Sequence, residues 1–260
     1  SFIDGMGTPL GSVTVDIDGE ARHVSTPDMG ADEFTPDTAM SPLVGVYTIG
    51  GATPDYIDFT TAVDDLNLRG IAGVVTFNVR PGSSPYPEQV EVLPISGASA
   101  TDTVVFQSEN GDSSTVVMTY NALSSSDNFV FKLSGASYVT IQNMTLAATS
   151  NSYCTVINMN GAVNNINIRN NIISGTINAN SSLIYSGDNI VSDIRITNNV
   201  LSEGNYGVVI NGDNNLHATG IVVNDNVITN STNNSITLED CNAPVVMGNV
   251  CSSSSSSNYG

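Results

Sequence analysis

The sequence repeats one short pattern four times, as Asn171-Ile172-Ile173, Asn199-Val200-Leu201, Asn226-Val227-Ile228 and Asn249-Val250-Cys251. An apolar residue stands three positions before each Asn: Ile168, Ile196, Val223 and Val246. A second ladder keeps a similar interval of about 25 residues through Leu133-Ser134-Gly135, Met159-Asn160-Gly161, Tyr185-Ser186-Gly187, Ile210-Asn211-Gly212 and Leu238-Glu239-Asp240. Another apolar residue stands two positions before the first residue of each of these triplets: Phe131, Ile157, Leu183, Val208 and Ile236.

Such a period predicts stacked coils. One coil of about 25 residues cannot bury its apolar face alone, whereas coils stacked about 4.8 Å apart pair each strand with the coils above and below. We therefore predict an all-β, right-handed parallel β-helix with regular coils over residues 127–255, its handedness taken from the general crossover rule. We expect Asn at the bends because it tolerates the left-handed conformation, and its stacked amides can form a ladder. The predicted ladder residues are Asn171, Asn199, Asn226 and Asn249.

The rest of the chain divides into an N-terminal segment and the start of the β-helix. Residues 1–36 are punctuated by Gly, Pro and acids and read as a closing segment, and residues 37–42 read as a linker. The β-helix module is expected over residues 43–260. Within it, residues 54–69 carry an apolar stripe at helical spacing, followed by Gly70. We expect one short helix there, capping the open end of the stacked sheets.

The composition limits the classes of partner that the chain can be expected to bind. Acids outnumber bases 25 to 6, which gives a formal net charge of −19 and makes nucleic acid an improbable partner. No apolar run is long enough to span a membrane. The three cysteines, Cys154, Cys241 and Cys251, show no zinc-site spacing. Cys251 takes the place of buried apolar residues in the other coils, so we expect a small core residue, with a Cys241–Cys251 bridge as the alternative.

An acid cluster gives the strongest chemical signal. Asp16, Asp18, Glu20 and Asp28 provide oxygen ligands of the kind that Ca²⁺ prefers, and Asp-x-Asp-Gly resembles the start of a calcium loop. The later acids of that loop are missing at the required spacing. The alternative is a structural turn with Arg22 paired to an acid. We expect that the protein requires no cofactor, and Ca²⁺ is the candidate for a bound ion.

Catalysis lacks a clear set of residues. A β-helix polysaccharide lyase needs a base, usually Lys or Arg, above a calcium held by carboxylates, and a hydrolase needs paired carboxylates. Lys132 should point outward, while Arg169 and Arg195 share a face on neighbouring coils without being stacked. No pair of acids accompanies them. We therefore do not expect an enzyme, and keep polysaccharide lyase or hydrolase, or glycan binding, as the alternative functions.

Two motifs resemble a known family. Gly45-Val46-Tyr47-Thr48-Ile49-Gly50-Gly51, the helix, Gly73-Val74-Val75-Thr76-Phe77-Asn78-Val79 and Val104-Val105-Phe106-Gln107-Ser108 resemble the start of the large secreted β-helix proteins of Bacteroidota, many of which are giant surface adhesins. Asp16-Ile17-Asp18-Gly19-Glu20-Ala21-Arg22, with Pro27-Asp28-Met29-Gly30-Ala31-Asp32-Glu33, resembles the segment that closes such a β-helix. The closing motif comes first, so we expect an internal piece of a tandem array.

The resemblance implies export to the cell surface or the extracellular space. It implies no single activity. From the inverted order of the two motifs and the missing catalytic set we predict a structural repeat of an extracellular fibre or adhesin, acting as a stiff stalk or display module. Its expected partners are neighbouring modules of the same protein, with surface glycans as a further candidate. The resemblance also implies O-glycosylation at Thr38 and Thr103, because Asp37-Thr38-Ala39 and Asp102-Thr103-Val104 fit the pattern used in Bacteroidota.

Overall fold

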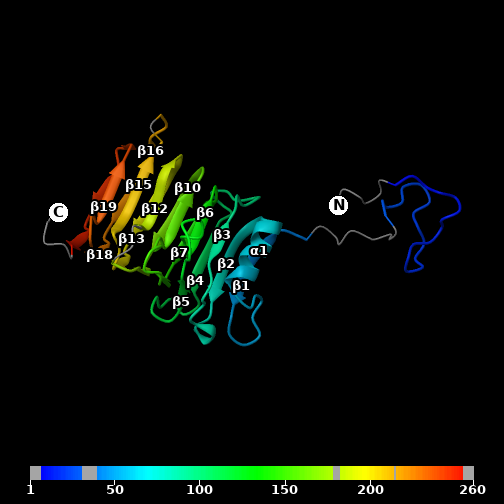
Figure 1. Ribbon diagram of the computed structural model, residues 1–260, viewed down its shortest axis with the longest axis horizontal. Helices are drawn as coiled ribbons and strands as arrows, with labels where there is room; N and C mark the ends of the chain where they lie inside the picture. Colours follow the sequence, from blue (N-terminus) through cyan, green and yellow to red (C-terminus); the bar gives the residue numbers. More distant parts are fainter. Residues whose placement is uncertain (1–6, 31–39, 178–181, 214, 254–260) are drawn as a thin grey trace. The chain divides into compact units, whose positions relative to one another are not determined.

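The structure is a computed structural model that describes residues 7–30, 40–177, 182–213 and 215–253. The chain divides into two compact units, Ser1–Ser41 and Pro42–Gly260. In the second unit, successive turns of the chain stack to form a β-solenoid of about seven turns, whose strands lie in three parallel sheets (Figure 1). The predicted fold class, a parallel β-helix with one helix, is confirmed.

Each turn of the solenoid contributes strands to three sheets. The ten-stranded sheet contains β1 (Leu43–Ile49), β2 (Ile71–Val79), β4 (Val104–Ser108), β7 (Ser137–Gln142), β10 (Val163–Arg169), β13 (Val191–Thr197), β16 (Ala218–Thr219), β17 (Val222–Asn224), β20 (Cys241–Asn242) and β21 (Val245–Met247). A second sheet contains β5 (Val117–Tyr120), β8 (Thr145–Ala148), β11 (Ile172–Ser174), β14 (Val200–Ser202), β18 (Val227–Ser231) and β22 (Val250–Ser253). A third contains β3 (Val90–Val92), β6 (Phe131–Ser134), β9 (Ile157–Asn160), β12 (Ser182–Asn189), β15 (Tyr206–Gly212) and β19 (Ile236–Glu239). Pro81–Ser83 forms a short 3-10 helix.

Inward side chains form apolar columns because parallel strands repeat every turn in register. One column of the ten-stranded sheet runs through fully buried Phe77, Phe106, Ile141, Ile168, Ile196 and Val223. The second sheet contributes Met118, Leu146, Ile173, Leu201 and Ile228. The core is therefore continuous along the solenoid axis, and each turn buries its apolar face against its neighbours.

The helix α1 (Phe59–Arg69) lies at the β1 end of the solenoid and buries Phe59, Ala62, Val63 and Leu66 (Figure 1). Its start was predicted five residues too early. The side chain of Asp58 accepts a hydrogen bond from the backbone N–H of Thr61 at 2.8 Å, which caps the helix there. Tyr56 is instead held in an isolated bridge to Ile49.

Aromatic packing fills the turns beneath α1. The rings of Phe77 and Phe106 stack with centroids 4.8 Å apart, and Phe131 meets Phe106 edge-on at 5.3 Å. Phe59 reaches down from α1 to Tyr86, also edge-on at 5.3 Å. These contacts join the helix to the core, in agreement with the predicted capping role. Parallel stacking also begins at β1, well before residue 127, where the regular coils were predicted to start.

The bends differ from the prediction. The left-handed conformation is adopted not by the four ladder Asn residues but by the residues immediately before them: Asn170, Asn198, Asp225 and Gly248, with φ of 55°, 55°, 56° and 68°. Asn143, one turn earlier, has φ of 53° and precedes Met144. A second left-handed column starts at Tyr138 and Asn165 on the same sheet. The ladder amides are thereby left to point inward.

The register of β12 also differs from the prediction. Ile184, and not Leu183, pairs with Ile157, and Ser186 takes the inward place between Met159 and Ile210. The three cysteines are free, so the alternative Cys241–Cys251 bridge is not formed. Cys251 pairs with Ile228 as predicted, but it is exposed because β22 is the last described strand of its sheet.

Candidate functional site

The four predicted ladder residues form one inner hydrogen-bonded column, the Asn ladder. The Nδ2 atoms of Asn171, Asn199 and Asn226 donate to the Oδ1 atom of the next member, Asn249 being the last, at 3.2, 3.0 and 2.9 Å. The same Nδ2 atoms also donate to backbone carbonyls of the preceding turn, at 2.8 to 2.9 Å. Asn171, Asn199 and Asn226 are at most 1% exposed. The ladder thus satisfies polar groups inside the core and is structural.

The predicted calcium residues lie in the first unit, where they serve a turn. Oδ1 of Asp16 accepts hydrogen bonds from the backbone N–H groups of Asp18 and Glu20, at 3.0 and 2.7 Å. Asp18 and Glu20 are exposed, whereas Asp28 is buried. Among the described residues, no group of three or more His, Cys, Asp or Glu side chains is placed to hold a metal. Calcium binding stays a prediction.

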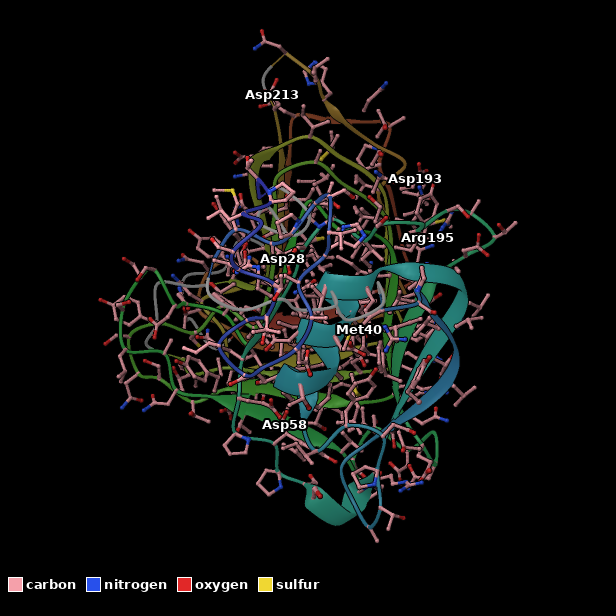
Figure 2. The ribbon with its side chains drawn as sticks, turned by 90° about the vertical axis from the view of Figure 1, so that its right-hand side faces the viewer. Asp28, Met40, Asp58, Asp193, Arg195 and Asp213 are labelled. Atoms are coloured by element: carbon pink, nitrogen blue, oxygen red, sulfur yellow. The ribbon has the colours of Figure 1, made fainter. Side chains whose placement is uncertain are left out.

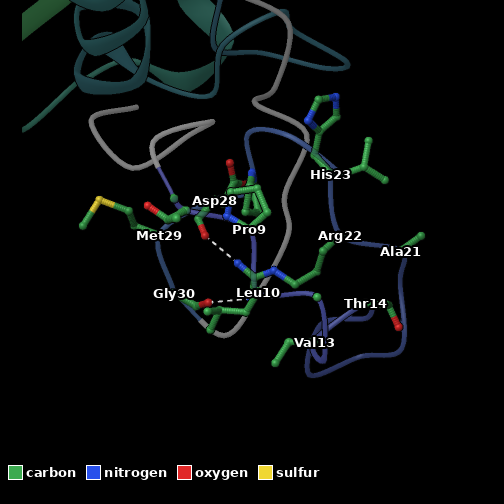
Figure 3. A pocket seen from close by; sticks show the side chains of 15 residues that line it. Pro9, Leu10, Val13, Thr14, Ala21, Arg22, His23, Asp28, Met29 and Gly30 are labelled. Atoms are coloured by element: carbon green, nitrogen blue, oxygen red, sulfur yellow. Dashed lines mark hydrogen bonds between the residues drawn. The ribbon is translucent and has the colours of Figure 1, made fainter.

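The first unit also contains a pocket of about 570 Å³ (Figure 3). Apolar side chains make up much of its lining, among them Leu10, Val13 and Met29. Arg22 donates hydrogen bonds to the backbone carbonyls of Asp28 and Gly30, seen as dashed lines in Figure 3. Through these two bonds the guanidinium joins residues 28–30 to the segment next to the antiparallel bridge between Val15 and Ala21, which is a structural role.

Of the two predicted glycosylation residues, Thr103 alone lies within the described part of the chain. Thr38 lies outside the described residues. Thr103 is half-buried just before β4, and its carbonyl accepts a hydrogen bond from the N–H of Val75 at 2.9 Å. O-glycosylation stays a prediction at both residues.

Lys132 points outward from β6, as the sequence predicts, and is held by an acid. Its Nζ lies 2.9 Å from Oε1 of Glu91 and 5.4 Å from the centroid of the Phe129 ring. The hydroxyl of Ser134 donates to the same carboxylate, and this bond, with the charge of Lys132, lowers the pKa of Glu91. Arg69 pairs with Asp65 in α1 in the same way. These cations are engaged in structural ion pairs.

Arg169 differs, because its partner on the outward face of the ten-stranded sheet is an amide. Its Nε donates to Oε1 of Gln142 at 2.6 Å. Gln142 donates in turn to Gln107, and Gln107 donates to Oδ1 of Asn78 at 2.9 Å. This outer amide ladder crosses four consecutive strands and ends at Arg169, whose side chain is exposed.

Arg195 lies on the neighbouring strand of the same face. It pairs in register with Asn167, while Arg169 pairs with Thr197, so the two arginines are diagonal neighbours and not stacked, as predicted. Figure 2 shows Arg195 and Asp193 at the outer margin of the ribbon. Arg195 is exposed, and within the described part of the chain no carboxylate lies in ion-pair distance of it.

Sequence reasoning missed the outer amide ladder. Its signal is an amide that directly follows an inward aromatic or aliphatic residue, as in Phe77-Asn78, Phe106-Gln107 and Ile141-Gln142. The turns that carry Asn78, Gln107 and Gln142 lie before the Asn ladder begins at Asn171, so they could not be aligned with the later repeats through that ladder. The sequence suggests Arg169 only as a candidate catalytic base, whereas in the structure its Nε donates a hydrogen bond to Gln142 at the end of the outer amide ladder.

Comparisons with family models, curated proteins and solved structures gave no match. Within the described residues, no helix combines the length and apolarity needed to cross a membrane.

Proposed function

We propose that this chain is a stiff structural module of an extracellular fibre or cell-surface adhesin, which acts as a stalk or display unit. The observation that carries the proposal is the Asn ladder. In it, buried side chains hydrogen-bond one turn to the next from Asn171 to Asn249, inside three sheets that already join every turn through the backbone. A solenoid joined in this way resists bending and local opening.

Stiffness follows from the hydrogen bonds and from burial. In a solenoid each turn contacts mainly its neighbours, so stability is a sum of interfaces between turns. An inward amide in such an interface must be satisfied, because a buried polar group without a partner costs about 1–3 kcal/mol. Separating two turns therefore breaks side-chain and backbone bonds together. The resemblance to secreted adhesins supports an extracellular place, with neighbouring modules of the same protein as partners.

Single-molecule pulling from the two ends of the second unit tests the mechanical role. We expect cooperative rupture steps that each release one or a few turns of about 25 residues, because the interfaces open one after another. Replacement of Asn199 by Ala should lower the rupture force of the turns that it joins. Smooth extension at low force, with no steps, would overturn the proposal.

The enzyme alternative is tested separately. A lyase or hydrolase would release new sugar ends from pectin, alginate or ulvan, whereas a structural module leaves these polymers intact. Sustained turnover by the purified chain, abolished in a variant of an outward Arg or Lys, would contradict a purely structural role.

A further inference from the structure

Among the described residues of the second unit, two cationic side chains form no ion pair with a carboxylate. Lys132, Arg69 and Arg80 pair with acids at 2.9, 2.8 and 3.1 Å. Arg169 and Arg195 show no such pair among the described residues, although acids outnumber bases 25 to 6 in the chain. Exposed cations on adjacent strands, with no ion pair among the described residues of so acidic a protein, favour a surface that binds an external anion.

We propose that this outward face binds an acidic polysaccharide, through the guanidinium groups of Arg169 and Arg195, without cleaving it. The proposal goes beyond the structural role, since stiffness needs neither arginine exposed. Arginine suits the task because its planar fork can bond a carboxylate or sulfate in bidentate geometry.

The two arginines stand at opposite corners of a small grid. Arg169 and Asn167 lie on β10, and Thr197 and Arg195 lie opposite them on β13. Strand spacing and rise per residue put the two arginine Cα atoms about 8 Å apart. The grid therefore offers two cationic forks with an amide and a hydroxyl between them, which matches a sugar chain that carries both anionic and hydroxyl groups.

The neighbours of the two arginines support this assignment. Gln142 holds Arg169 through Nε, which orients this exposed side chain and leaves its two terminal nitrogens out of that bond. Asp193 is the nearest acid along β13, but its Oδ1 lies over Gly220, only 2.5 Å from where a Cβ would be. The absence of a side chain at Gly220 thus gives this carboxylate a place in the next turn, and it forms no ion pair with Arg195.

The outward face of the ten-stranded sheet differs from the rest of the chain in the sign of its net charge. Along the ten strands of the sheet the charged residues are Arg169, Asp193 and Arg195, which gives this face a net positive charge on a chain of −19. Long-range repulsion of a polyanion is screened beyond about 8 Å at physiological salt, whereas the arginine contacts act at hydrogen-bond distance. A sheet of ten strands can also contact several sugars at once.

Surface-immobilised polysaccharides provide the test, at physiological salt and with the complete chain. We expect binding to polygalacturonate or alginate and none to neutral dextran, and a sulfated galactan distinguishes sulfate from carboxylate recognition. Arg195→Gln and Arg169→Gln should each weaken binding about tenfold, the loss of one charge-assisted contact. Lys132→Gln is the matched control: it removes the same charge from a different sheet and should change affinity less than about twofold.

Several results would overturn the proposal. These are no binding to any acidic polysaccharide, equal weakening by all three variants, or equal binding to polyglutamate, which carries carboxylates without sugars. Unchanged melting temperatures of the variants would show that the loss comes from the surface and not from the fold. Because pulling experiments read out stiffness independently, failure here leaves the structural proposal to be judged on its own test.

Discussion

The side chain of Asn199 donates to Oδ1 of Asn226 at 3.0 Å, and its own Oδ1 accepts the backbone and side-chain N–H groups of Asn171, at 3.0 and 3.2 Å. Its Nδ2 also donates to the carbonyl of Ile168 at 2.9 Å. One buried residue thereby connects three successive turns of the solenoid. No apolar side chain of similar size could satisfy the same groups.

Replacement of Asn199 by Ala should therefore be costly. It leaves the carbonyl of Ile168 and the N–H of Asn171 buried without this partner, and we expect a loss of about 3 kcal/mol in the free energy of unfolding. Urea denaturation measures it. Asn158→Ala, an outward and half-buried Asn on β9, is the control and should change stability by less than about 0.5 kcal/mol. Equal losses in both variants would contradict a special role for the ladder.

The left-handed bends make a separate prediction. Asn198 has φ of 55° and is exposed, so its backbone conformation, and not its packing, decides which residues fit there. Asn198→Gly should keep or slightly raise the melting temperature, while Asn198→Val should lower stability by about 1–2 kcal/mol, because a β-branched residue is strained in this conformation. Thermal unfolding followed by circular dichroism compares the two. A Val variant as stable as the Gly variant would rule out the bend as the cause.

The repeats predicted the fold because inward positions must align once per turn. The interval of about 25 residues and the paired apolar positions survive even though the loops differ. Side-chain direction was harder to predict. Both Asn170 and Asn171 fit a bend by residue type, and only the turn geometry shows that Asn170 adopts the left-handed conformation while Asn171 points inward.

The candidate site was predicted less well than the fold. Sequence placed Arg169 and Arg195 on one face, but ion pairing depends on which acids reach them in space. Asp193 lies two residues from Arg195 and would be expected to pair with it, yet Gly220 in the next turn gives its carboxylate another place. Contacts of this kind, between successive turns, cannot be predicted from the sequence of a single turn.

Acid should destabilise the protein through Asp127. Hydrogen bonds from Ser124 and Leu123 lower the pKa of this carboxyl from its usual 3.8 to about 2. Between these values the unfolded chain binds more protons than the folded one, so the contribution of Asp127 is complete above pH 3.8 and is lost as pH falls toward 2. Melting temperatures across this range should fall less steeply in Asp127→Asn, and parallel curves would show that other groups dominate.

Ser186 gives a prediction in the opposite direction, a gain in stability. It takes the inward position between Met159 and Ile210, is fully buried, and its hydroxyl finds no hydrogen-bond partner among the described residues. Ser186→Ala removes an unsatisfied polar atom from an apolar column, so the free energy of unfolding should rise by about 1 kcal/mol.

The matched control for Ser186 is Ser192→Ala, an outward and half-buried serine on β13, where we expect a change within about 0.5 kcal/mol. Urea denaturation of both variants measures the difference. A loss of stability in Ser186→Ala would show that the hydroxyl is bonded to a trapped water, since only a satisfied group costs free energy when it is removed. A gain in Ser186→Ala alone would establish that the shifted register of β12 places a polar side chain in the core at a net cost to the fold.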